Sequence, residues 1–188
     1  MAAMTPKRHA VLLALLLGAC SAGTSAPAPE RVVEARTSAM PAQRGAPALR
    51  QVMLARHNAA RAAVGVAPLT WDEALAKDAG AYAQQMARNG RFEHAEQHGQ
   101  GENLFTGTRD AYSYAEMIDL WTAERRDFVN AATPGFSRTG RAGDVAHYAQ
   151  IVWRGSRSVG CAPSSNARDD FLVCRYSPTG NVVGERAY

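Results

Sequence analysis

Cysteine is scarce in this 188-residue chain, which holds only Cys20, Cys161 and Cys174. The chain also lacks a His-Glu-x-x-His run and any cluster of cysteines and histidines, so the common zinc-finger and zinc-protease patterns are excluded. An odd number of cysteines would leave one unpaired thiol in an oxidising compartment. The place of each cysteine in the chain therefore bears on where the protein works.

Excess charge is equally scarce. The formal net charge is +4, and it falls to about +2 if Lys7 and Arg8 are removed with the N-terminal segment described below. The basic stretches Arg125–Arg126 and Arg138–Arg141 are short and interrupted, which indicates a solvated surface and not a nucleic-acid interface. With 46% apolar and 20% charged residues, the composition is typical of a globular protein with room for one domain.

Long hydrophobic runs are absent apart from Ala10–Leu17, which is too short to span a membrane as a permanent helix. Lys7-Arg8 precede this run, as in the charged region of an export signal. The run ends in Leu17-Gly18-Ala19-Cys20, which resembles a bacterial lipobox, where small residues precede a cysteine that is diacylated and becomes the new N-terminus. We therefore expect residues 1–19 to be a lipoprotein signal peptide and Cys20 to be lipidated.

This expectation gives a location and leaves one alternative. A lipidated Cys20 would anchor the protein in the cell envelope, at the outer membrane in a Gram-negative host because Ser21 and not Asp follows it. The alternative is an ordinary signal peptide cut near Ala26, which would give a secreted protein. If Cys20 carries lipid, Cys161 and Cys174 remain as an even pair, and export favours a disulfide between them.

Residues 20–47 are expected to hold the lipidated cysteine and a flexible tether rich in Ala, Pro, Ser and Thr, followed by one folded domain over 48–188. Apolar periodicity and capping boxes predict three helices: Ala48–Val64 with Gly65 as C-cap, one from Thr70-x-x-Glu73 to Asn89-Gly90, and one from Ser113-x-x-Glu116 to about Asn130. Two β-prone segments, Ser158–Ala162 and Phe171–Tyr176, predict a hairpin with one cysteine on each arm. Helices followed by an antiparallel sheet indicate an α+β fold.

Glu124 is the residue that fits its predicted surroundings least. Met117, Trp121 and Phe128 share one face of the third predicted helix, and Glu124 points the same way, three residues after Trp121. A carboxylate on an apolar stripe is costly unless it is paired or hydrogen-bonded. Glu124 therefore either reaches solvent at a ragged helix boundary or belongs to a partly buried polar site with a cationic or metal partner.

The histidines are the candidate partners. His57 lies near the buried face of the first helix, which favours a hydrogen-bonded core histidine. His94 and His98 lie just before Gly101-Glu102-Asn103, and His147 follows a glycine-rich loop. Two histidines and two carboxylates from separate segments can form a polar cleft, although spacing alone does not establish it.

Four motifs carry a family resemblance: His57-Asn58-x-x-Arg61, Gly101-Glu102-Asn103-Leu104, His147-Tyr148-Ala149-Gln150-Ile151-Val152-Trp153-x-x-Ser156, and Phe171-Leu172-Val173-Cys174-Arg175-Tyr176-x-Pro178-x-Gly180-Asn181-Val182. In this order they cover about residues 49–188 and resemble the signatures of the CAP superfamily. This superfamily joins cysteine-rich secretory proteins, antigen 5 and plant pathogenesis-related type 1 proteins. The segments Leu69-Thr70-Trp71 and Gly184-x-Arg186-x-Tyr188 resemble the plant branch most.

The resemblance implies a three-layer α-β-α sandwich with a central antiparallel sheet. It also implies a cleft lined by two histidines and two glutamates. Matched residue by residue, these are His94, Glu102, Glu124 and His147. For the first of these histidines His98 is an alternative to His94. The apolar residue in Phe92-x-His94 favours His94.

Binding is the function that this cleft favours. We expect an extracytoplasmic module that holds a divalent ion, Zn2+ or another, weakly through His94 and His147, with the glutamates orienting the imidazoles. A metal-dependent hydrolase is an alternative, but two histidines fall short of the three protein ligands common at catalytic zinc. Ser156, the best-placed serine, also has no identifiable partner that would make it a nucleophile.

A third hypothesis, implied by the resemblance, is a sterol- or lipid-binding protein that uses an apolar groove beside the sheet. The expected partners are therefore a membrane, through the N-terminal lipid, and a small lipid or sterol. Nucleic acid is not an expected partner.

Overall fold

The computed structural model describes residues 44–96 and 99–188. Its elements follow in the order α1 (Ala46–Ala62), β1 (Thr70–Trp71), α2 (Glu73–Asn89), β2 (Gly101–Thr108), α3 (Tyr114–Ala123), η1 (Glu124–Arg126), η2 (Ala142–Val145), α4 (Ala146–Ile151), β3 (Ser158–Ser165) and β4 (Asp169–Ser177). Among the described residues, no helix is long and apolar enough to cross a membrane. The expected signal peptide and Cys20 lie outside the described residues.

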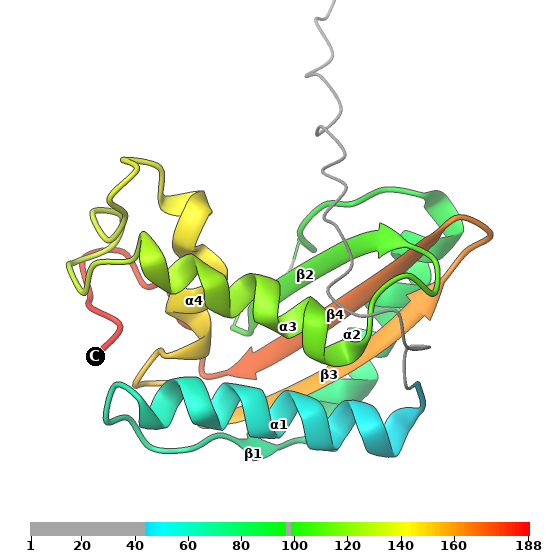
Figure 1. Ribbon diagram of the computed structural model, residues 1–188, viewed down its shortest axis with the longest axis horizontal. Helices are drawn as coiled ribbons and strands as arrows, with labels where there is room; N and C mark the ends of the chain where they lie inside the picture. Colours follow the sequence, from blue (N-terminus) through cyan, green and yellow to red (C-terminus); the bar gives the residue numbers. More distant parts are fainter. Residues whose placement is uncertain (1–43, 97–98) are drawn as a thin grey trace, which may run out of the picture. The chain divides into compact units, whose positions relative to one another are not determined.

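The four strands form one sheet in the order β1-β3-β4-β2, with β2 at an edge. β4 pairs antiparallel with β2 and β3, whereas β1 pairs parallel with β3 over two residues. α2 covers one face of the sheet, and α1, α3 and α4 lie on the other (Figure 1). The predicted α+β sandwich is confirmed. The sheet is mixed and not purely antiparallel, because the chain leaving α1 runs beside β3 in the same direction.

Alternation along β4 builds a separate apolar layer on each face of the sheet. Phe171 and Val173 pack against α2, whereas Leu172 and Cys174 pack against the helices of the opposite face. α2 passes very close to Gly160 on β3. A Cβ there would lie 2.2 Å from a backbone nitrogen of α2, so only glycine permits this helix to lie so close to the strands.

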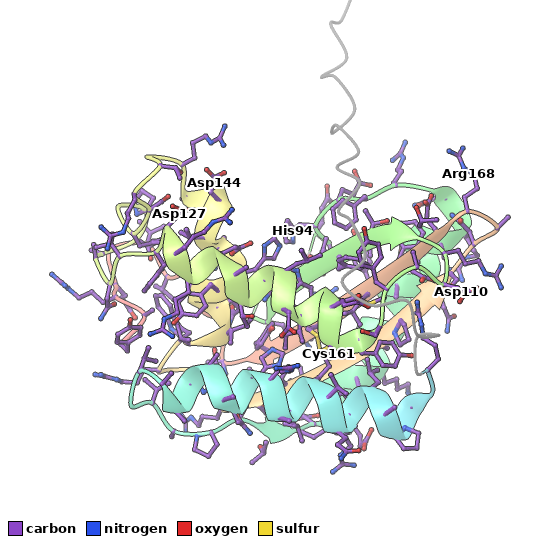
Figure 2. The ribbon with its side chains drawn as sticks, in the orientation of Figure 1. His94, Asp110, Asp127, Asp144, Cys161 and Arg168 are labelled. Carbon is purple, nitrogen blue, oxygen red and sulfur yellow. A yellow bond between two sulfur atoms is a disulfide. The ribbon has the colours of Figure 1, made fainter. Side chains whose placement is uncertain are left out.

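The predicted disulfide joins the two arms of the hairpin. Cys161 on β3 lies directly opposite Cys174 on β4, and the two are bonded with Cα atoms 4.1 Å apart. Both residues are buried, and Cys161 is labelled in Figure 2. The predicted pairing is therefore confirmed, and the bridge lies inside the larger apolar layer.

The start of α2 differs from the prediction. The N-cap is Asp72, whose carboxylate accepts hydrogen bonds from two backbone N–H groups of the first turn. Thr70 lies in β1, where its own N–H donates to the Arg157 carbonyl. The predicted capping box at Thr70 is wrong, because pairing with β3 holds this residue in the sheet and the helix begins at Glu73.

The other helix boundaries are mixed in outcome. Gly90, with φ of 69°, ends α2 as predicted, and Ser113 and Glu116 form the predicted capping box of α3. α3 ends at Ala123, however, well before Asn130. The backbone tightens there into the 3-10 turn η1, which begins at Glu124.

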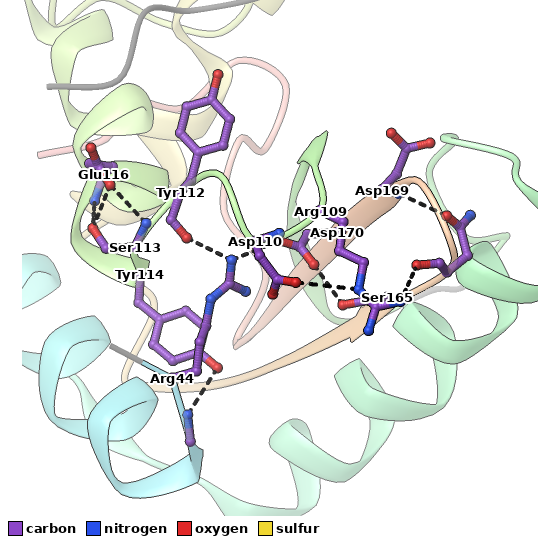
Figure 3. Close-up of polar contacts among 12 residues, drawn as sticks. Arg44, Arg109, Asp110, Tyr112, Ser113, Tyr114, Glu116, Ser165, Asp169 and Asp170 are labelled. Carbon is purple, nitrogen blue, oxygen red and sulfur yellow. Dashed lines mark hydrogen bonds and ion pairs between the residues drawn. The ribbon is translucent and has the colours of Figure 1, made fainter. Parts of the chain in front are cut away.

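The folded part also begins before the predicted start at Ala48. α1 starts at Ala46, and the Arg44 guanidinium donates to the Asp170 carboxylate and the Tyr112 carbonyl, both at 2.7 Å. Asp170 is only 1% exposed and lies at the centre of the polar cluster in Figure 3, which joins β4 to the segment between β2 and α3. The end of the predicted tether is therefore part of the domain.

A buried chain of hydrogen bonds links α1 to α4 through the sheet. His57 Nδ1 donates to the Met53 carbonyl at 2.7 Å, so Nε2 accepts from the Tyr176 hydroxyl, also at 2.7 Å. Asn103 Nδ2 donates to the same hydroxyl and to the His147 carbonyl, each at 3.1 Å. The interpretation of His57 as a hydrogen-bonded core histidine is confirmed.

The burial of His57 makes the stability of the fold sensitive to acid. Burial lowers the pKa of His57 from 6.5 to about 4, and it raises the pKa of Tyr176 well above its ordinary value. Between pH 6.5 and 4, His57 is protonated in the unfolded chain but not in the folded protein. The free energy of unfolding therefore decreases as pH falls. The full effect is about 3 kcal/mol.

We predict that His57→Gln flattens this decrease, because glutamine can still hydrogen-bond but does not titrate. Urea unfolding at several pH values between 7 and 4 measures the slope in both proteins. Every other titrating group is common to the two, so the difference between the slopes reports His57. Equal slopes would contradict the prediction.

Candidate functional site

His94 and Glu102 form the first of two histidine–glutamate pairs. Glu102 follows the first residue of β2, and its Oε1 accepts a hydrogen bond from His94 Nδ1 at 2.6 Å. The backbone N–H of Ala95 donates to the same oxygen at 3.1 Å. The Glu102 side chain is 5% exposed and that of His94, labelled in Figure 2, is 67% exposed. A buried carboxylate therefore holds an exposed imidazole.

His147 and Glu124 form the second pair. His147 Nδ1 donates to Glu124 Oε1 at 2.6 Å, and the Tyr148 N–H donates to Glu124 Oε2 at 3.0 Å. The Trp121 indole stacks on the imidazole, with ring centroids 5.7 Å apart and planes at 15°. Glu124 thus fixes one edge of the His147 ring, and Trp121 covers one of its faces.

The end of α3 explains how Glu124 reaches His147. Glu124 is the C-cap of α3 and the first residue of the 3-10 turn η1. Its side chain is 17% exposed and bonds to residues of α4. Of the two interpretations of Glu124, the partly buried one with a polar partner describes its surroundings, and the partner is an imidazole.

The start of β2 lies between the two pairs. Successive side chains of a strand point to opposite faces, so Glu102 points toward the α2 face while Asn103 points toward α4 and donates to the His147 carbonyl. Gly101 lets α4 approach, because a Cβ there would lie 2.2 Å from Gln150 Oε1. Glu102 therefore positions His94, whereas Gly101 and Asn103 position α4 and with it His147.

Only two nitrogens of this arrangement remain open as ligands. Both oxygens of Glu124 accept hydrogen bonds, and Oε2 of Glu102 lies 2.8 Å from Arg175 Nη2. In the described part of the chain, Nε2 of His94 and Nε2 of His147 make no hydrogen bond. No group of three or more His, Cys, Asp or Glu side chains among residues 44–96 and 99–188 is placed to hold a metal ion. The site can therefore offer two imidazole nitrogens, not a closed cage of ligands.

The four predicted cleft residues thus form two pairs beside one strand. The structure joins His94 to Glu102 and Glu124 to His147. That both pairs share one ion stays a prediction. His98 lies outside the described residues, and the hydrogen bond of His94 to Glu102 is the observation that favours His94 for this position.

The surroundings of Glu102 include a buried arginine that the sequence motifs did not indicate. Arg175 of β4 lies opposite Glu102 in the register and is 4% exposed. Its guanidinium lies over the Tyr82 ring of α2, 5.3 Å from the centroid. Burial, with the Glu102 charge adding to it, raises the pKa of Tyr82. A charged residue inside the apolar run Phe171–Tyr176 was the available signal, because such a residue needs a buried partner.

A separate groove of about 260 Å³ lies between α1 and α3. Three small residues of α1, Ala59, Ala60 and Ala63, line it together with Thr122 and Tyr148. Its charged lining residues are Arg56, Asp119 and Arg125, of which Arg56 and Asp119 form an ion pair at 3.4 Å. This groove is therefore lined by small apolar and by charged side chains.

Comparison with known proteins gives the family. Residues 54–176 match the family described as CAP: Cysteine-rich secretory protein family, and the chain belongs to this family. Over 136 residues it is 41% identical to a pathogenesis-related protein of PR-1 type from Sambucus nigra, a match that covers 70% of this chain and 77% of that protein. Pathogenesis-related protein 1C from Nicotiana tabacum is 41% identical over 141 residues, covering 73% and 80%. The domain is therefore PR-1-like, as its motifs indicated.

Solved structures show the same fold at lower sequence identity. The crystal structure of NaASP2 with Zn2+ matches with a TM-score of 0.65 and 24% identity, covering 76% of this chain and 86% of that one. Schistosoma mansoni venom allergen-like protein 4 matches with a TM-score of 0.58 and 19% identity, covering 74% and 93%. The arrangement of four helices on a mixed four-stranded sheet is thus the CAP fold.

Proposed function

We propose that the domain is an extracytoplasmic binding module whose cleft holds a divalent metal ion, zinc or a similar ion, through Nε2 of His94 and Nε2 of His147. The observation that carries this proposal is the same in both pairs: a carboxylate accepts from Nδ1 at 2.6 Å. Such a hydrogen bond places the proton on Nδ1 and leaves the Nε2 lone pair free to bind a metal.

The donor set fits a weakly held ion. Imidazole nitrogens suit zinc, copper and nickel, but two of them leave at least two positions of a tetrahedral ion for water or a ligand. A bound ion would supply an open site that polarises whatever carbonyl, carboxylate or water fills it. Glu102 and Glu124 would act by orienting the imidazoles, because their oxygens already have partners. Support also comes from NaASP2, a protein of the same fold whose structure includes Zn2+.

Hydrolysis is the less supported use of the same cleft. Three protein ligands are common at catalytic zinc, and the described residues offer two. Ser156 is buried, donates to the Pro178 carbonyl and accepts from Gln150, so its hydroxyl is committed to structure and not placed beside a histidine as a nucleophile would be.

We predict that His147→Ala and His94→Ala each weaken zinc binding by about tenfold or more, because each removes one of two ligands. Isothermal titration calorimetry with zinc alone compares these proteins, and His98→Ala is the matched control at the neighbouring histidine. Equal zinc affinity in all four proteins would mean that the two pairs are structural.

The α1–α3 groove supports lipid binding as a second candidate function. The three alanines of α1 in its lining suit a hydrocarbon, and Arg125 suits a carboxylate head group. Its volume of about 260 Å³ is just below the range of ~300–1,000 Å³ typical of ligand pockets. The groove therefore fits part of one acyl chain better than the four rings of a sterol.

We predict that Ala59→Phe fills this groove and weakens binding of a fluorescent fatty acid by about tenfold. Ala55→Phe is the matched control, because Ala55 is also exposed on α1 but does not line the groove. Fluorescence titration of the three proteins is the measurement. The candidate function fails if both variants bind the fatty acid as the wild type does.

The location is proposed from the family and from the N-terminal sequence together. CAP and PR-1 proteins are typically secreted, and the disulfide between Cys161 and Cys174 agrees with an oxidising compartment. We propose that Cys20 is the lipidated N-terminus of the mature chain and that its lipid anchors the domain to a membrane.

Mass spectrometry of the mature N-terminus tests this anchor. The expected species begins at Cys20 and carries a diacylglycerol on the thiol. An unmodified chain that begins beyond residue 21 would show instead that an ordinary signal peptide is removed and that the protein is released.

A further inference from the structure

A buried ion pair lies directly behind the exposed His94. Glu102 on β2 and Arg175 on β4 are directly paired on these neighbouring strands, and their side chains are each 5% exposed. Arg175 Nη2 lies 2.8 Å from Glu102 Oε2. Within the described residues, this oxygen has no hydrogen bond of its own, so the guanidinium is the group that compensates its burial.

The two oxygens of Glu102 are therefore divided between two tasks. Oε2 faces Arg175 inside the protein, while Oε1 accepts from His94 Nδ1 at 2.6 Å and from the Ala95 N–H at 3.1 Å. Because a carboxylate is planar and rigid, fixing Oε2 also fixes the direction of Oε1. The orientation of the His94 ring thus depends on a cation that does not touch it.

α2 holds the far side of this arrangement. The Arg175 guanidinium lies 5.3 Å from the centroid of the Tyr82 ring, which is a cation–π contact. The Tyr82 hydroxyl donates to the Glu93 carbonyl at 2.6 Å, directly before His94. Tyr82 thereby restrains Arg175 with its ring and the His94 segment with its hydroxyl, so the pair is held from two sides.

We propose that Arg175 is a positioning residue of the cleft, which fixes Glu102 so that His94 keeps its proton on Nδ1 and presents Nε2 outward. The metal-binding part of this inference rests on the proposed function, whereas the effect on the histidine tautomer does not. Outer partners of metal ligands contribute about 10- to 100-fold to metal affinity. In this proposal Arg175 supports Glu102, and Glu102 in turn supports His94.

The test compares Arg175→Gln, Arg175→Lys and a matched control, Arg44→Gln. Arg44 also forms a 2.7 Å ion pair with a buried carboxylate of β4, Asp170, but at the hairpin end of the strand. In metal-free protein, long-range ¹H–¹⁵N NMR reports the His94 tautomer, with the His94 signals assigned by their loss in His94→Ala. Calorimetry then reports zinc affinity.

The wild type and Arg44→Gln should show the Nδ1–H tautomer of His94 and equal zinc affinity. Arg175→Gln should show a mixture of tautomers and about tenfold weaker zinc binding. Arg175→Lys should be intermediate, because lysine keeps the charge but lacks the planar group that rests on Tyr82.

Each outcome separates the inference from the proposed function. A wild type that does not bind zinc overturns the metal site and leaves the tautomer to decide the role of Arg175. An unchanged tautomer together with unchanged zinc affinity in Arg175→Gln overturns the positioning role. If circular dichroism shows that Arg175→Gln does not fold, Arg175→Lys decides, and full equality with the wild type in both measurements overturns the proposal.

Discussion

The Tyr176 hydroxyl is the constraint on which the rest of the structure depends. It belongs to a side chain of β4 with no exposure to solvent, where an unpaired hydroxyl would be costly. It donates to His57 of α1 and accepts from Asn103 of β2. Asn103 uses its second N–H to hold the His147 carbonyl. One buried hydroxyl thus sets the distance between α1, the edge strand and the helix that carries a candidate ligand.

The start of β2 connects this hydrogen-bond network to the candidate site. β2 is an edge strand, and its start contacts the loop that carries His94 through Glu102 and contacts α4, which carries His147, through Asn103. Alternation then assigns Glu102 to one face and Asn103 to the other. Glu102 and Asn103 are neighbours in sequence, yet they contact two histidines, His94 and His147, that are far apart in the chain.

The sequence predicted those parts of the structure that depend on local chemistry. The capping box at Ser113, the glycine that ends α2 and the opposed cysteines of the hairpin each follow from a few neighbouring residues. The failures share a different cause. Thr70 satisfies a capping motif, but a long-range pairing with β3 decides its conformation. The mixed sheet and the fold of Arg44 onto Asp170 likewise depend on partners far away in the chain, which periodicity does not report.

Glu124 shows how a misfit with local pattern can carry functional information. The apolar stripe of Met117 and Trp121 predicts burial at this position, and a buried carboxylate demands a donor. The chain meets that demand by ending α3 at Ala123 and directing the carboxylate to His147. Apolar periodicity shows that the Glu124 carboxylate needs a hydrogen-bond donor, but it does not show that the donor is His147. His147 reaches Glu124 through the packing of α4 on α3.

The same logic applies to Arg175, and it limits what the cleft can do. Glu102 faces Arg175 in an ion pair and accepts from His94 and the Ala95 N–H, while Glu124 accepts from His147 and the Tyr148 N–H. Among the described residues, the Nε2 atoms of His94 and His147 make no hydrogen bond. A carboxylate whose oxygens already accept hydrogen bonds or face a guanidinium is not free to act as a base, so the packing leaves the two oriented imidazole rings as the groups of this site that can still meet a ligand.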